Sequence, residues 1–326
     1  MDDLNLTILL ASVIAGAAPI VLASLGETLS EKAGVINLSL DGSILLSAMV
    51  AFAAAYQSHS LVLGFLAGSI AGALVAALVG LFSIYLGQSQ VAVGFVLTLT
   101  AKDLAYFFGN PYSRLYGPQV GTYNIPWLHE IPFLGPVFFK QALPVYLSLA
   151  LIAGCWFYLY RTRWGLSLRA VGENPSAAYA RGIPVRRAQL WYTIAGGLLI
   201  GLAGATFSLC VKLGWGRPQG AEGTGWIALA LVIFGGWHPV RVALGAYLFA
   251  LLQVLGIHFQ GWLPSIPSQV FQVAPFPLMI FVLVLTQSAQ AGRGPTTLER
   301  RGFFRKLWRI LSGAAPAALG KSFRPG

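Results

Sequence analysis

The chain has 326 residues, of which 56% are hydrophobic and only 10% are charged. Soluble domains carry roughly 25% charged residues, so this chain has too little polar side chain to cover a water-soluble core. The composition therefore predicts an all-α polytopic membrane protein. The formal net charge of +11 does not indicate a nucleic-acid partner, because the basic residues lie between apolar runs and in the tail, where they meet lipid headgroups.

Apolar runs of about 20 residues are long enough to cross a bilayer as helices. We predict such spans at 4–25, 33–55, 61–86, 90–108, 141–160, 188–212, 240–258 and 269–289, with a shorter ninth crossing at 225–236. The chain is thus expected to comprise a transmembrane domain over 1–290 and a basic cytoplasmic tail over 291–326, whose last dozen residues are rich in Ala, Pro and Gly and are expected to be disordered.

The distribution of basic residues predicts the orientation of these spans. With nine crossings and the N-terminus outside, all but five of the 21 Lys and Arg residues lie on the cytoplasmic side, as the positive-inside rule requires. The five exceptions are Lys102, Arg114, Lys140, Lys212 and Arg217. The Pro- and aromatic-rich loop 110–140, with a short surface helix, is then extracytoplasmic, and the charged loop 161–187 is cytoplasmic.

Nothing in the sequence indicates catalysis, a metal site or a cofactor. The four histidines are scattered without metal-ligand spacing, and neither GxSxG nor a strand followed by GxGxxG occurs. Cys155 and Cys210 lie inside apolar runs and are interpreted as small buried hydrophobes. We therefore expect no catalytic residue, no metal and no cofactor.

Polar residues interrupt the second predicted span. Gly34, Asn37, Ser39, Asp41 and Gly42 favour a broken helix, which a bilayer tolerates only against protein or water. Two interpretations stay open: the polar break lines a solute path, or Asp41 caps a half-helix and holds the break open.

A second interrupted element lies at 223–239, where glycines and Pro239 flank a short apolar core. Trp226 and Phe234 in this core are further candidates for the solute path. Two such segments of opposite direction predict a weak inverted repeat with the path between them.

The loop 161–187 carries helix signals of its own. Asn174-Pro175 is typical of a helix start, and Gly182 and Pro184 of a helix stop. We favour short surface helices that dock into a groove of a soluble partner over a plain solvated connector.

Three stretches resemble one family. Residues 25–42 read LGETLSEKAGVINLSLDG, residues 169–183 read RAVGENPSAAYARGI, and residues 225–239 read GWIALALVIFGGWHP. In this order they resemble permeases of ABC importers of the branched-chain amino acid, ribose and nucleoside superfamily, most closely the nucleoside branch. Asp41 stands where that branch usually has Glu, and Ser39 where Gly is common.

The resemblance implies a type II-like ABC importer permease in a prokaryotic inner membrane, most closely one for nucleosides, with a sugar or a branched-chain amino acid as alternative solutes. It implies ATPase subunits, a second permease forming a heterodimer and an extracytoplasmic solute-binding protein or lipoprotein as partners, with ATP hydrolysis in the ATPase. The implied ATPase-coupling residues are Arg169, Gly172, Glu173, Asn174, Pro175, Ala177, Ala178 and Gly182. An ion-coupled secondary transporter is the alternative from another class.

Overall fold

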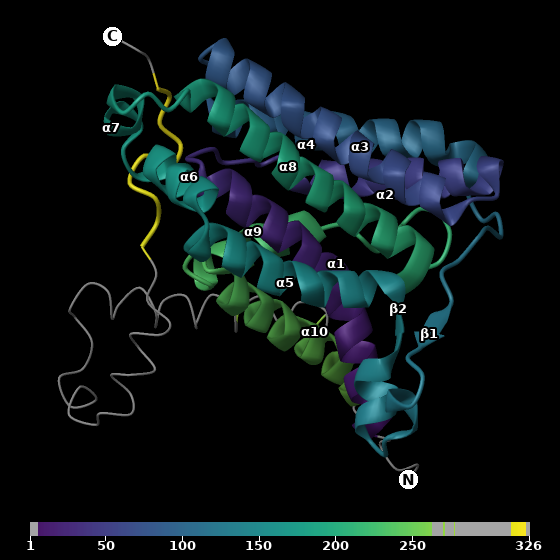
Figure 1. Cartoon of the computed structure of the whole chain (residues 1–326). Coiled ribbons are helices and arrows are strands. Elements are labelled where there is room, and N and C mark those ends of the chain that lie inside the picture. Colours follow the sequence, from purple (N-terminus) through teal and green to yellow (C-terminus); the bar gives the residue numbers. More distant parts are fainter. Residues whose placement is uncertain (1–5, 263–269, 271–276, 278–313, 324–326) are drawn as a thin grey trace.

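The computed structural model describes residues 6–262, 270, 277 and 314–323. Within these residues the protein is mostly helical, and seven helices are long and apolar enough to cross a membrane (Figure 1). They are α1 (Leu6–Lys32), α2 (Leu40–Ser58), α3 (Leu61–Gly80), α4 (Gln90–Gly109), α5 (Leu143–Arg161), α8 (Val185–Thr206) and α10 (Pro239–Trp262). Short π-helical or 3₁₀ turns continue three of them: η1 (Leu81–Tyr85) after α3, η2 (Asn110–Tyr112) after α4 and η5 (Phe207–Val211) after α8.

The predicted polytopic all-α class is confirmed, but the total of nine crossings stays a prediction. The run at 225–236 forms only a short helix, α9 (Thr224–Phe234), and the run at 269–289 lies outside the described residues. The first predicted span, 4–25, is too short, because α1 continues to Lys32. The second, 33–55, begins too early, because α2 starts at Leu40.

The long helices run between two ends of the molecule (Figure 1). One end carries α6 (Arg163–Glu173) and α7 (Pro175–Ala180) and is called the α6 end below. The other carries a two-stranded antiparallel sheet of β1 (Thr122–Asn124) and β2 (Lys140–Ala142), with η3 (Leu128–Glu130) and η4 (Gly135–Phe139) between them, and is called the β1 end. The short sheet was not predicted, because its strands are only three residues long.

Helices α3 and α8 pack with their backbones almost in contact, through glycines that face each other. A Cβ atom built on Gly72 would lie 2.4 Å from the carbonyl oxygen of Gly197, and one on Gly201 would lie 2.4 Å from that of Gly68. Small residues permit this approach, which van der Waals packing then stabilises without help from water. The small-residue stripes of these two helices are therefore packing surfaces.

The last described residues, 314–323, have a defined place at the α6 end. The backbone N–H of Ala318 donates to the carbonyl oxygen of Gly172, and that of Gly320 to the carbonyl oxygen of Gly34, both at 3.0 Å. The predicted disorder is therefore wrong for 315–323: tertiary hydrogen bonds order a segment whose composition by itself does not specify a fold.

The glycine contacts generate a prediction about stability. Gly201→Ala places a methyl group against the α3 backbone and should lower the free energy of unfolding by about 1–3 kcal/mol. Gly154→Ala makes the same chemical change in α5, where a Cβ atom meets nothing within 4 Å, and should be neutral or slightly stabilising. Thermal melting of the detergent-purified proteins measures both, and equal melting temperatures would contradict the packing argument.

Candidate functional site

The first part of the site is the non-helical connection 33–39 between α1 and α2. Helix α1 ends at Lys32, and two residues later Gly34, with a left-handed φ of +88°, lets the N–H of Val35 reach back to the carbonyl oxygen of Ser30 at 3.1 Å. The chain then stays non-helical until Leu40. The break therefore precedes α2, and Asp41 lies in the first turn of α2 instead of in the break.

Contacts with α4 show how far this connection enters the helix bundle. The N–H of Ile36 donates to Oε1 of Gln90 at 2.8 Å, and the hydroxyl of Thr98 donates to the carbonyl oxygen of Leu38 at 2.9 Å. Gln90 and Thr98 are eight residues apart, or about 12 Å along a helix. The connection thus runs from the α6 end into the bundle alongside α4, and α2 begins well inside.

Buried polar side chains satisfy the backbone of this connection. Oε1 of Glu27 accepts the N–H of Asn37 at 2.9 Å, and Oδ1 of Asn37 accepts the N–H and the hydroxyl of Ser39 at 3.1 and 2.6 Å. All three residues are fully buried. Irregular backbone at membrane depth needs such internal partners. Asn37 and Ser39 therefore hold the break in shape, and neither side chain reaches the surface of the chain.

The second part of the site is the stretch between α8 and α10. It leaves the β1 end, where the N–H of Val120 donates to the carbonyl oxygen of Leu209 at 3.0 Å. It arrives at the α6 end, where the indole N–H of Trp237 donates to the carboxylate of Glu31. In between, Glu222 accepts the hydroxyl of Tyr106 and the N–H of Gln219. The stretch therefore passes from one end to the other as a non-helical half followed by α9.

The 33–39 connection with α2, and the stretch that ends with α9, each pass between the two ends of the molecule with a non-helical part, and they are called the interrupted crossings below. They meet at Asp41 and Gly225. Oδ1 of Asp41 accepts the N–H of Gly225 at 3.2 Å, so a carboxylate on the first turn of α2 caps the first turn of α9. A Cβ atom on Gly225 would lie 2.2 Å from the backbone nitrogen of Asp41, and therefore only glycine fits. The helices run away from this contact toward opposite ends. Because both present their positive N-terminal ends, a negative side chain between them is favourable.

The five predicted path residues do not line one surface. Asn37 and Ser39 are fully buried and Asp41 is 5% exposed, whereas Trp226 is 39% exposed and Phe234 is half-buried. Of the two interpretations of Asp41, the cap is the contact that the structure contains. The described residues hold no group of three metal-ligating side chains.

The third part of the site is the pair of helices α6 and α7. Oδ1 of Asn174 accepts the N–H of Ala177 at 3.0 Å and Pro175 takes the first position of α7, while Gly182 follows α7 with a left-handed φ of +83°. The predicted start and stop signals are therefore confirmed. Helix α6 is capped in the same way: the hydroxyl of Thr162, the residue before Arg163, accepts the N–H of Gly165 at 3.0 Å.

The eight predicted coupling residues divide between an inner and an outer face. Gly172 and Ala178 are buried, and a Cβ atom on Gly172 would lie 2.2 Å from the carbonyl oxygen of Lys32, the last residue of α1. Arg169 places its guanidinium 5.1 Å from the ring centroid of Tyr160. Pro175 is half-buried. The remaining four are exposed: Glu173, Asn174, Ala177 and Gly182.

The α6 end also contains a histidine at the start of α10. The ring of His238 stacks on Tyr160 with centroids 5.1 Å apart. Burial, together with the positive charges of Arg241 and Lys32, lowers the pKa of His238 below its usual range. His238 is therefore neutral at pH 7 and adds no charge to this strongly basic end.

Several residues of the site were not selected from the sequence alone. Glu27 and Glu31 tie α1 to both interrupted crossings, and Tyr106 holds Glu222. A signal for the first two exists, since paired carboxylates in an apolar span are costly and rare. Tyr106 carries no such signal, because tyrosine is common near the ends of membrane helices.

Comparison with known proteins shows the family of this chain. The seven long apolar helices are those of a multi-pass membrane protein, and residues 9–283 match the family described as branched-chain amino acid transport system / permease component. The chain belongs to this family of ABC transporter permeases. No solved structure matches the chain.

Among its relatives is the putative glucose ABC transporter permease protein TsgC13 of Haloferax volcanii, 38% identical over 78% of both chains. The nucleoside ABC transporter permease protein NupC of Lactococcus lactis is 33% identical over 86% of this chain and 92% of its own length. The guanosine ABC transporter permease protein NupQ of Bacillus subtilis is 30% identical over 85% and 91%.

The cap between the two half-helices can be tested by substitution. Asp41→Ala removes the acceptor of the Gly225 N–H and should lower the free energy of unfolding by about 1 kcal/mol, as loss of a helix cap does. Asp41→Asn keeps an acceptor oxygen and should cost less. Thermal melting of the purified variants measures both, and an Asp41→Ala protein as stable as the wild type would contradict the cap.

Proposed function

We propose that this chain is the transmembrane subunit of an ATP-driven importer for nucleosides in a prokaryotic inner membrane. The proposal rests on the near full-length likeness to two permeases named for nucleosides or guanosine. The likeness to a putative glucose permease makes a sugar the second candidate solute. ATP hydrolysis belongs to a partner ATPase, and this chain itself moves the solute without catalysing a reaction.

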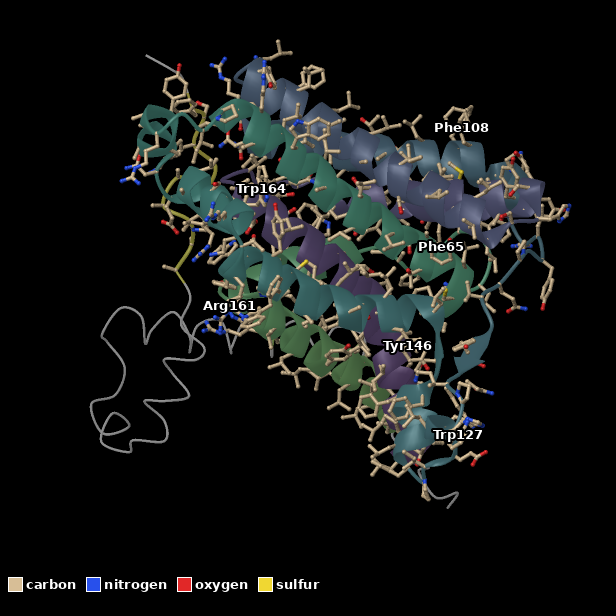
Figure 2. All side chains as sticks on the ribbon, in the orientation of Figure 1. Phe65, Phe108, Trp127, Tyr146, Arg161 and Trp164 are labelled. Carbon is tan, nitrogen blue, oxygen red and sulfur yellow. The ribbon has the colours of Figure 1, made fainter. Side chains whose placement is uncertain are left out.

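We propose that the α6 end faces the cytoplasm. Basic residues gather there, and Figure 2 places Arg161 at this end, opposite Trp127 at the β1 end. The described basic residues at the α6 end are Lys32, Arg161, Arg163, Arg169, Arg181, Arg186, Arg187, Arg241 and Lys321. The positive-inside rule then puts the N-terminus outside, the C-terminus inside and the β1 end toward an extracytoplasmic solute-binding protein.

The outer face of α6 and α7 is proposed as the ATPase docking surface. Two short capped helices with exposed Glu173 and Ala177 at their junction offer an exposed surface to a groove in the partner. The buried face of α6 touches the end of α1 through Gly172. Movement of α6 by the ATPase would therefore reach the 33–39 connection directly.

The solute path is proposed to run along the exposed face of α9, between this chain and a second permease. Trp226 and Ile233 are 39% and 40% exposed on a short helix that starts inside the bundle, where an aromatic ring offers a stacking surface to a nucleobase or sugar. The two half-helices beside this path are held in place by hydrogen bonds of Asn37, Ser39 and Asp41, which do not themselves line the path.

The docking surface leads to a prediction about the partner. Ala177→Arg adds a long side chain to an exposed position without touching the core, and it should remove the ATPase chain from the affinity-purified complex while membrane insertion stays normal. Gly121→Arg makes a similar change at the β1 end, where nothing lies within 4 Å, and should keep the ATPase. A wild-type chain that purifies without any ATPase would contradict the ABC mechanism and favour ion-coupled transport.

The path leads to a prediction about uptake. Trp226→Ala should lower uptake of a radiolabelled nucleoside about tenfold, because base stacking on an aromatic ring contributes about 1–3 kcal/mol. Trp191→Ala removes an even more exposed indole, 66% against 39% for Trp226, from α8 and away from the path, and it should leave uptake unchanged. Competition with unlabelled glucose and guanosine identifies the solute class, and displacement by glucose alone would overturn the nucleoside assignment.

A further inference from the structure

Residues 314–323, here called the C-terminal strap, join two parts of the site that are far apart in sequence. The N–H of Ala318 donates to the carbonyl oxygen of Gly172 in α6, and the N–H of Gly320 donates to that of Gly34 at the start of the 33–39 connection. The N–H of Ala317 donates to the carboxylate of Glu173 at 3.2 Å. Figure 1 shows the strap in yellow beside α6 and α7.

Two partly buried side chains of the strap pack on different hydrophobic clusters. Phe323 packs on the cluster of Val171, Ala178 and Val185, and its ring lies 5.6 Å from that of Tyr179 in α7. Leu319 packs on a second cluster, formed by Val232, Trp237 and Val242. The strap therefore contacts α6, α7, the first interrupted crossing and the end of the second.

The strap adds to a contact between α6 and α1 that is otherwise narrow. Gly172 lies against Lys32 with no room for a side chain. Gly320 lies against Ile36, and a Cβ atom built on Gly320 would lie 3.1 Å from Cδ1 of Ile36. Ala318, between the two hydrogen-bonded carbonyl groups of Gly172 and Gly34, is 6% exposed. The small residues Ala318 and Gly320 thus fit between α6 and the connection, and their N–H groups hydrogen-bond to both.

We propose that the C-terminal strap is a positioning element of the transport cycle, which makes α6 and the 33–39 connection move as one unit. This inference rests on the proposed function, because it assumes that an ATPase pushes on α6 and α7. The strap transmits the movement of α6 and α7 to the interrupted crossings. The strap itself is not needed for ATPase binding, since Ala177 and Gly182 lie on the exposed face of the loop.

The decisive variant removes one hydrogen bond from the strap. Ala318→Pro deletes the N–H that Gly172 accepts, whereas Ala318→Gly keeps it at the same position. Ala315→Pro introduces the same ring at an exposed position for which no backbone hydrogen bond is found in the described structure. A chain that ends at Gly313 removes the strap altogether.

The measurement is made on the complex purified with its ATPase and on cells that take up the labelled solute. We expect Ala318→Pro and the shortened chain to retain the ATPase and hydrolyse ATP, while solute moved per ATP falls about tenfold. Ala318→Gly and Ala315→Pro should behave as wild type. Full uptake per ATP in both Ala318→Pro and the shortened chain would overturn the proposal.

Two further outcomes are distinguishable. If the Ala318→Pro complex loses the ATPase while the wild-type complex keeps it, the strap is not a positioning element and belongs to the docking surface itself. Absence of an ATPase from the wild-type complex would instead overturn the proposed function. Bismaleimide cross-linking of Tyr179→Cys with Phe323→Cys reports docking of the strap directly, and it should be efficient in the wild-type background and lost with Ala318→Pro.

Discussion

The structure depends on one constraint: backbone polar groups inside a membrane must find partners within the protein. Two crossings of this chain are only partly helical, and polar side chains of the protein complete the hydrogen bonding of each. In the 33–39 connection, Glu27 accepts a backbone N–H group and the hydroxyl of Thr98 donates to a backbone carbonyl oxygen. Before α9, Glu222 accepts a backbone N–H group. Asp41 then closes the gap between the two half-helices. The polar residues of an otherwise apolar chain are therefore concentrated where helices stop.

Helix α1 organises both interrupted crossings. Glu27 holds Asn37 of the first, and Glu31, one turn later, holds Trp237 at the end of the second. A displacement of α1 at the α6 end would therefore move both interrupted crossings at the same time. Because Gly172 of α6 packs on the last residue of α1, the proposed docking surface, the two carboxylates and the Asp41–Gly225 contact form one continuous set of packed groups.

The opposite side of the molecule is a rigid support. Glycines let α3 and α8 approach until no side chain fits between them, and α2 packs against both, with Gly204 of α8 also facing the backbone of α2 at Ile44. Close packing of this kind deforms little and has few alternative arrangements. Movement in a transport cycle is therefore expected on the side of α6, α9 and the strap, where the contacts are hydrogen bonds and short helices.

The sequence by itself determined the membrane class, most of the spans, the two interruptions and the caps of α7, because these depend on local hydropathy and on residues such as Asn174, Pro175 and Gly182. It also placed Asp41 at an interruption. Only the tertiary structure decided that Asn37 and Ser39 face inward, that Asp41 caps α9 across 184 positions of sequence, and that residues 314–323 are ordered. The reason is physical: these properties depend on packing and hydrogen bonds between different segments of the chain, and no local pattern specifies which distant group will be the partner.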